Sequence, residues 1–137
     1  MTLDPQVESW YGHPRTEDPW WNESGWFGFA VPERHINGWF HFMHRPNMGL
    51  TAGGVAVWDD RGSDRHDCLF YHWFPFNPLP TNGDMFDFTL SNGMQVQMVD
   101  PLREYRLRFN DPKLQLDLRW KGTVEPQVAS LAMATST

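Results

Sequence analysis

The side chains that could carry acid–base chemistry in this sequence lie among aromatic residues. Glu23 is flanked by tryptophans, and His41 and His72 each lie within an aromatic run. Loss of hydration beside indole rings raises the pKa of a carboxyl group, so Glu23 could stay protonated and donate its proton to an alkene or a carbonyl group. Either histidine could act as a general base or as a polar anchor. We therefore take Glu23, His41 and His72 as the candidate catalytic residues.

Aromatic residues would form the binding surface around this chemistry. They make up 15% of the chain, with 8 Trp and 10 Phe. Large flat side chains bury much apolar area at a low cost in conformational entropy, so they favour pockets and interfaces. The sequence thus predicts a cavity for a largely apolar small molecule such as a terpenoid or a steroid. The predicted ligand-binding residues are Trp21, Trp26, Trp39, Tyr71 and Trp73.

Each polar candidate also has a structural interpretation. Glu23 could accept backbone N–H bonds near the first strand, and either histidine could be a hydrogen-bonded core residue. Side chains alternate along a strand, so Trp39 and His41 share a face whereas His72 and Trp73 do not. Only one histidine can then line a cavity beside these tryptophans, and His41 is favoured. Two functions follow: an enzyme or enzyme subunit with cofactor-free acid–base chemistry, or a non-catalytic ligand-binding or structural partner subunit.

The charge and the residue spacing exclude other classes of function. The net charge is −6, with 17 acidic and 11 basic residues and no basic cluster, so we expect no nucleic-acid partner. No spacing of His, Cys and acidic residues indicates a metal site, and no phosphate loop is present, so we expect no metal and no cofactor. No apolar run is long enough for a membrane span, and the first residues lack the pattern of a signal peptide. With Cys68 as the single cysteine, we expect a cytoplasmic protein without an internal disulfide.

Turn signals divide the chain into short segments typical of an all-β fold. Gly, Pro, Asn and Asp recur between these segments, and no segment has a helical period. The pattern predicts an antiparallel meander of about eight strands in residues 23–126, with an irregular arm at 1–22 and a flexible tail at 127–137. The predicted strands cover residues 25–31, 36–45, 51–58, 67–76, 84–91, 94–99, 103–110 and 114–122.

Two short motifs predict local geometry within this meander. Asn92-Gly93 predicts a type I′ hairpin turn, because both residues tolerate the left-handed conformation that this turn needs. The residues expected on the buried face around this turn are Phe88, Leu90, Met94 and Val96. Gly53-Gly54 lies within a predicted strand, where it allows a bend or a close approach of neighbouring chain.

The predicted strands 36–45 and 67–76 are apolar on both faces. Trp39, His41 and Met43 alternate with Phe40, Phe42 and His44, and Tyr71 and Trp73 alternate with Phe70, His72, Phe74 and Phe76. A strand with two apolar faces is covered on both. One face can line the interior of a barrel. The other then requires the N-terminal arm, a second copy of this chain or a second related chain, so we expect an oligomer.

Several segments also resemble one known family. Residues 20–29, with a Glu beside paired aromatic residues, look like the first strand of the lipocalin-like hydroxyneurosporene synthase (carotenoid hydratase) superfamily. Residues 46–49, 55–59 and 105–109 are similar to an uncharacterised branch of it. The resemblance implies a lipocalin-like barrel or half-barrel, of the N-terminal type, that usually occurs as one of two tandem copies. It further implies an isoprenoid or polyketide-like ligand, with hydration, isomerisation or cyclisation as the reaction, and a second copy that completes the pocket.

Overall fold

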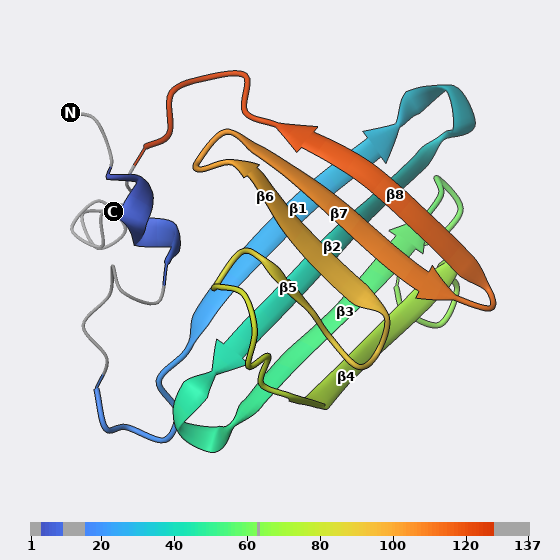
Figure 1. Ribbon diagram of the computed structural model, residues 1–137. Coiled ribbons are helices and arrows are strands. Elements are labelled where there is room, and N and C mark those ends of the chain that lie inside the picture. The colour runs from blue at the N-terminus through green and yellow to red at the C-terminus, as the bar shows by residue number, and fades with distance from the viewer. Residues whose placement is uncertain (1–3, 10–15, 63, 128–137) are drawn as a thin grey trace, which may run out of the picture.

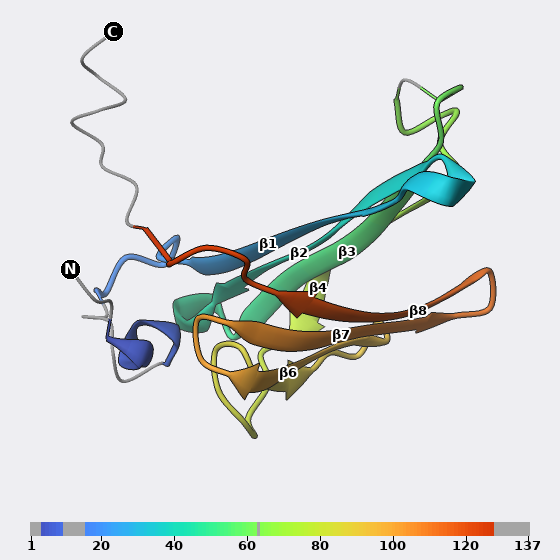
Figure 2. The same ribbon diagram turned by 90° about the horizontal axis from the view of Figure 1, so that it is seen from above.

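The chain folds into two antiparallel sheets that lie face to face (Figures 1 and 2). The structure is a computed structural model, and it describes residues 4–9, 16–62 and 64–127. Sheet 1 has the strand order β1-β2-β3-β4, and sheet 2 has the order β5-β6-β7-β8. The strands are β1 (Glu23–Val31), β2 (Ile36–Arg45), β3 (Leu50–Trp58), β4 (Phe70–Pro78), β5 (Phe88–Thr89), β6 (Met94–Asp100), β7 (Glu104–Asp111) and β8 (Leu114–Lys121).

This architecture confirms the predicted all-β meander. Each strand of a sheet pairs with the strand before it in the chain, and every pairing is antiparallel. In the described ranges the two sheets share no strand pairing, so they form an open half-barrel or sandwich rather than a closed barrel. The single-turn 3-10 helices are η1 (Pro5–Glu8), η3 (Pro32–Arg34) and η4 (Pro46–Met48). No helix in the described ranges has the length and the hydropathy that crossing a membrane requires.

The core lies between the sheets and follows the alternation of side chains. On β2, Phe40, Phe42 and His44 face sheet 2, and each is 0% exposed. Strand β7 contributes Leu107 and Phe109 from the opposite side. The space between the sheets is filled by the side chains of Phe27, Phe40, Phe42, Val55, Val57, Phe88, Leu90, Met94, Val96, Tyr105, Leu107 and Phe109.

The β5–β6 hairpin has the predicted buried face but not the predicted turn. Phe88 pairs with Val96, and both are buried together with Leu90 and Met94. The turn is a three-residue loop instead of a type I′ turn, because the Leu90 amide donates to the Met94 carbonyl and only Gly93 has a positive φ, of 95°. A type I′ turn at Asn92-Gly93 would pair Met94 with Ser91 and shift the register, so burial of the apolar face decides the register here.

Two strands differ from their predicted bounds. The predicted strand 84–91 shortens to Phe88–Thr89, because the backbone groups of Asp84 and Asp87 bond to each other in both directions and close a tight turn. The predicted strand 67–76 is shifted to Phe70–Pro78, with an irregularity in its pairing between Thr51 and Gly53. Phe74 and Phe76, expected on the same face as His72, are 37% and 65% exposed.

A buried polar network ties the β5–β6 hairpin to sheet 1. The Asn77 amide nitrogen donates to the Thr51 carbonyl (3.1 Å), and its amide oxygen accepts from the Ser91 hydroxyl (2.8 Å) and the Asn92 backbone (2.9 Å). Asn77 is 0% exposed, and buried polar groups are stable only when they are paired in this way. The network therefore fixes where sheet 2 lies on sheet 1.

Hydrogen bonds attach the described parts of the N-terminal arm to the body. The Tyr105 hydroxyl donates to the Glu8 carboxylate at the end of η1, and the same carboxylate accepts from the Leu102 amide (2.9 Å). Burial and this carboxylate raise the pKa of Tyr105. Asn47 donates from its side chain to the Thr16 carbonyl (2.8 Å), which holds the second part of the arm. Most of the predicted tail, 128–137, lies outside the described residues.

His44 is a neutral imidazole inside the core. Its Nε2 lies 2.9 Å from the Met85 carbonyl, which can only accept, so Nε2 carries the proton. Its Nδ1 then accepts from the Thr51 hydroxyl, at 2.9 Å. Burial lowers the pKa of His44 to about 4, because a charged imidazolium would lose its hydration here.

His44 should make the stability of the fold depend on pH. The pKa in the folded state lies below that of the unfolded chain, so this contribution to stability is complete above pH 6.5 and is lost as the pH falls toward 4. Between pH 7 and pH 4 the free energy of unfolding should fall by about 3 kcal/mol more in the wild type than in His44→Gln. The measurement is urea unfolding at several pH values. His66→Gln, at an exposed loop residue, is the control and should follow the wild type. Parallel curves for wild type and His44→Gln would contradict this assignment.

Candidate functional site

The face of sheet 1 that points away from sheet 2 carries a cluster of rings, which we call the aromatic platform. It consists of Trp26 from β1, Trp39 and His41 from β2, and Tyr71 and Trp73 from β4. Trp39 is its centre, with ring centroids 5.3 Å from Trp26, 6.0 Å from Tyr71 and 6.3 Å from Trp73. Trp26 and Tyr71 remain 59% and 44% exposed. The platform is thus a half-open apolar surface.

Small residues of β3 make room for these rings. Gly54 lies between His41 and Trp73 in the register, and Ala56 lies between Trp39 and Tyr71. Because β3 places only Gly54 and Ala56 between these rings, the rings of β2 and β4 reach across it and meet, with His41 and Trp73 5.4 Å apart. This explains the predicted close packing at Gly53-Gly54. An added Cβ on Gly54 would overlap the His72 carbonyl oxygen and lie 2.9 Å from the Trp73 Cα.

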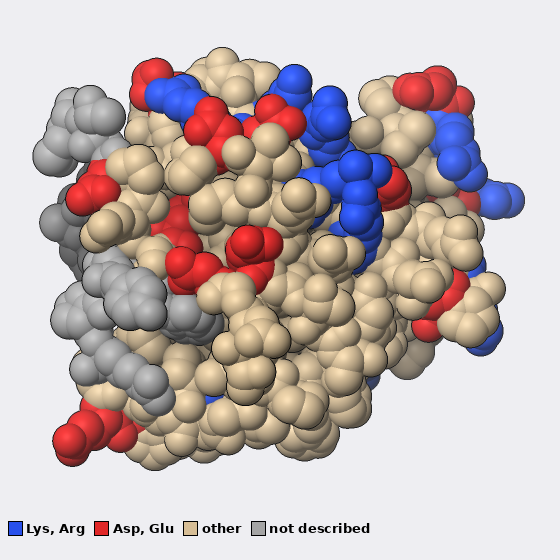
Figure 3. All heavy atoms as spheres, viewed as in Figure 1, with Lys and Arg blue, Asp and Glu red and all other residues tan. Residues whose placement is uncertain are grey.

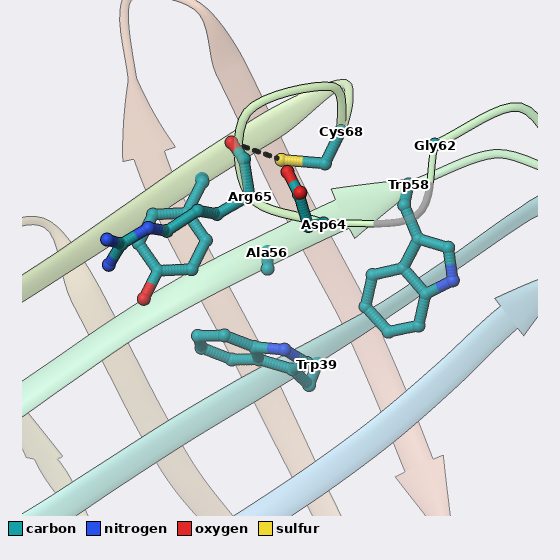
Figure 4. Close-up of a pocket in the computed structure, with 8 residues that line it drawn as sticks. Trp39, Ala56, Trp58, Gly62, Asp64, Arg65 and Cys68 are labelled. Atoms are coloured by element: carbon teal, nitrogen blue, oxygen red, sulfur yellow. Dashed lines mark hydrogen bonds between the residues drawn. The ribbon is translucent and has the colours of Figure 1, made fainter.

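A pocket of about 220 Å³ opens at one end of the platform, over Ala56 (Figure 4). Trp39 and Trp58 stand on either side of Ala56, and the loop between β3 and β4 passes above it. The Cys68 thiol points back into this loop and donates to the Arg65 carbonyl, at 3.4 Å. The pocket over Ala56 is lined by Trp39, Ala56, Trp58, Gly62, Asp64, Arg65, Cys68 and Tyr71.

A second hollow is larger but has a different chemistry. It has a volume of about 610 Å³ and lies beside residues 78–83 and the short edge strand β5. Its only aromatic lining residue is Phe88, which belongs to the core. Turn residues such as Asn82 and Gly83 form much of its wall. It therefore lacks the stacking surface that an apolar ligand needs, and the pocket over Ala56 is the better candidate.

The structure brings most of the predicted ligand-binding residues together. Trp26, Trp39, Tyr71 and Trp73 are all members of the platform, and His41 joins them as the parity argument favoured. Their position corrects the predicted interior cavity, because the platform lies on the outer face of sheet 1 while core side chains fill the space between the sheets. In the described residues no ring contact joins Trp21 to the platform, and the Trp21 amide donates to the Asp18 carbonyl.

The other two candidate catalytic residues lie on the opposite face of sheet 1. Glu23 pairs with His44, so its side chain is on the face toward sheet 2. His72 pairs with Val55 on that same face, where it stacks near Phe109 and lies 3.2 Å from the Asn92 amide nitrogen. Both are thus separated from His41 by the thickness of the sheet.

His41 is the titratable group of the platform. Its ring lies 4.7 Å from Trp26 and 5.4 Å from Trp73, measured between centroids. Partial burial among these rings lowers the pKa of His41, so its imidazole is neutral at pH 7. A neutral imidazole can donate one hydrogen bond and accept another, which suits a hydroxyl or carbonyl group of an otherwise apolar molecule.

Sequence reasoning missed the pocket wall that the β3–β4 loop forms. The sequence predicted a strand that ends at residue 58 and another that begins at residue 67, because alternation does not show where the chain between them folds back. Trp58, an apolar residue at the end of a predicted strand, was the sequence feature that could have indicated this wall. Among the described residues, no three His, Cys, Asp or Glu side chains are grouped as a metal site would need.

The outer face of sheet 2 is different in character. Figure 3 shows Lys, Arg, Asp and Glu side chains mixed over the strands of this sheet. Arg106 makes two hydrogen bonds to Asp117, at 2.9 and 3.0 Å, and Glu104 lies within ion-pair distance of Arg119 and Lys121. This is the solvated surface expected of an antiparallel sheet with one wet face. The outer face of sheet 1 differs from this charged surface because it carries the aromatic platform.

Gly54→Ala tests whether the platform depends on the absence of a side chain at position 54 of β3. The added Cβ has no room, so the substitution should lower the free energy of unfolding by about 2–4 kcal/mol and weaken the near-UV circular dichroism of the tryptophans. Gly28→Ala is the matched control on the same face, where an added Cβ meets nothing within 4 Å, and it should change stability by less than about 1 kcal/mol. Equal stability of the two variants would refute the packing described above.

The comparisons with known proteins give a family. Neither the curated proteins nor the solved structures include a match to this chain. A family model described as a domain of unknown function, DUF7064, matches residues 6–135. The match includes all eight strands, both sheets and every residue of the aromatic platform. The chain therefore belongs to the DUF7064 family.

Proposed function

We propose that this protein binds a largely apolar small molecule on the aromatic platform, with one end of the ligand in the pocket over Ala56. The observation that carries the proposal is the position of Trp39, which is at once the centre of the platform and a wall of the pocket. Monomeric proteins seldom leave so many aromatic rings in contact with water unless the surface has a partner. A ligand that covers the rings would remove this exposed area.

The dimensions of the pocket define how the ligand binds. A volume of about 220 Å³ is below the ~300–1,000 Å³ of pockets that enclose a whole drug-sized ligand. The ligand therefore inserts one end and lies with the remainder against Trp26, Trp39 and Trp73. Long or flat apolar molecules such as terpenoids and steroids meet this requirement. The resemblance of residues 20–29 to carotenoid hydratases points to the same class of molecule.

Binding is better supported than catalysis. Hydration, isomerisation or cyclisation without a cofactor needs an acid and a base beside the same ligand. His41 meets that condition on the platform, whereas Glu23 and His72 lie on the other face of the sheet. The acid–base role of the three residues stays a prediction, and His41 enters the proposal as a polar anchor.

Ala56→Leu should abolish most ligand binding. The larger side chain fills the pocket from its floor, so the affinity for farnesol, a neutral isoprenoid alcohol, should fall at least ~10-fold. Equilibrium dialysis with radiolabelled farnesol measures this, and circular dichroism checks that the variant is folded. Ala30→Leu, an equal change at an exposed position on the outer face of β1, should bind like the wild type. Equal affinities of Ala56→Leu and wild type, or no binding by the wild type, would end the proposal.

A second copy of this chain is the competing occupant of the platform. The exposed rings of Trp26 and Tyr71 favour it, since a flat aromatic surface is typical of the core of a protein interface. Phe40 and Phe42, on the other face of the predicted strand 36–45, are 0% exposed in the core of one chain and are not available for such an interface.

Trp26→Glu tests whether a second copy of the chain, rather than a ligand, covers the platform. A charge in the middle of an obligate interface dissociates it, so sedimentation at micromolar concentration should show an oligomer for the wild type and a monomer for this variant. Ala56→Leu should leave the mass unchanged, because its added atoms lie beneath the rings. A wild type that sediments as a monomer would leave the ligand as the occupant of the platform.

A further inference from the structure

One end of the platform carries an arginine in an unusual environment. Arg45 is the last residue of β2 and lies on the same face as Trp39, His41 and Met43, because side chains alternate along the strand. Trp39 and Arg45 are six positions apart, which corresponds to about 20 Å along the strand. The pocket over Ala56 and Arg45 thus lie at opposite ends of one row of side chains.

Arg45 has no acidic partner among the described residues. Its side chain is half-buried, and its Nε is buried without a hydrogen-bond acceptor. The guanidinium group lies against the ring of Trp20, with its Cζ 5.4 Å from the ring centroid. Stacking of this kind holds the group in place but accepts none of its hydrogen bonds. A buried donor without an acceptor is costly, so the described residues leave part of the hydrogen-bonding capacity of this guanidinium group unused.

Several other arginines among the described residues have carboxylate partners. Arg61 pairs with Asp59 at 3.0 Å, Arg103 with Glu125 at 3.0 Å, and Arg106 with Asp117 at 2.9 Å. Glu23, at the start of the neighbouring strand, is on the opposite face of the sheet from Arg45. At the other end of the row, Arg65 has Asp64 beside it on the rim of the pocket. Arg45 is therefore the cation of this face that is best placed to receive an anion.

We propose that the ligand is an amphipathic acid whose carboxylate is bound by Arg45 while its apolar body lies on the aromatic platform. The planar guanidinium group matches a carboxylate, and a charge-assisted hydrogen bond in this half-buried position is stronger than one in water. The rings of Trp39 and His41 receive the hydrocarbon part. This inference rests on the proposed function and adds the chemical class of the ligand to it.

The experiment compares two ligands that differ only in the head group, farnesol and farnesoate, at pH 7.5. The wild type should bind farnesoate at least ~10-fold more tightly than farnesol, as expected when a charged group replaces a neutral one at an arginine. Arg45→Met keeps the apolar stem of the side chain and should remove this preference while the affinity for farnesol stays within ~3-fold. Arg34→Met, at an exposed arginine of η3 beside the other end of β2, is the matched control and should keep the preference.

The possible outcomes distinguish a failure of the proposed function from a failure of the inference that Arg45 binds a carboxylate. No binding of either ligand by the wild type contradicts the proposed function itself. Equal binding of both ligands by the wild type overturns the inference alone, and so does a preference that persists in Arg45→Met or disappears in Arg34→Met. If Arg45→Met does not fold, Arg45→Lys takes its place. It keeps the charge but lacks Nε, so it should reduce the preference without abolishing it, and an unchanged preference would overturn the role of the guanidinium group.

Discussion

The structure depends on one steric constraint: in the middle of β3, neither face of the strand can carry a side chain. Gly53 faces sheet 2, where an added Cβ would lie 2.8 Å from the Met94 sulfur, and Gly54 faces outward beneath the rings of β2 and β4. Glycine weakens a strand because it orders a flexible backbone and packs no side chain. Here that cost is offset twice, since the same dipeptide lets sheet 2 approach from one side and lets the aromatic platform close over the other.

The approach of sheet 2 also determines what the inner histidines do. Because Gly53 has no side chain, the Asn92 amide reaches its carbonyl oxygen, at 3.2 Å, and the same amide lies beside His72. His44 is enclosed by Thr51 and the Met85 carbonyl in a similar way. His44 on β2 thus bonds to β3 and to the segment before β5, and His72 on β4 lies within hydrogen-bond distance of the turn between β5 and β6. His41 differs because its neighbours are rings rather than hydrogen-bonding groups.

Alternation along the strands was sufficient to predict the class of fold, most strand positions and the grouping of Trp39 with His41. It could not predict which of two apolar faces would be covered, because that depends on where the second sheet folds back, and so the expected interior cavity proved to be an outer platform. The residues of the turns predicted the local backbone geometry less well. Asn92-Gly93 favoured a type I′ turn, but burying Met94 and Val96 was worth more than the preferred turn, and the register followed the core. Arg45 was not predicted as a site residue, since the absence of a carboxylate partner is visible only in three dimensions.

The distribution of charge gives Arg45 its significance. On the outer face of sheet 2, Arg106 and Arg108 lie within ion-pair distance of Asp117, which offsets part of their positive charge. On the outer face of sheet 1, the residues between Arg45 and the pocket are Met43, a neutral His41 and Trp39, none of which screens a positive charge. Low polarity beside a half-buried cation strengthens its attraction for an anion and at the same time favours hydrocarbon over water. A molecule that combines an acid with an apolar body satisfies both conditions, whereas a wholly apolar ligand would leave the positive charge of Arg45 without a counter-ion.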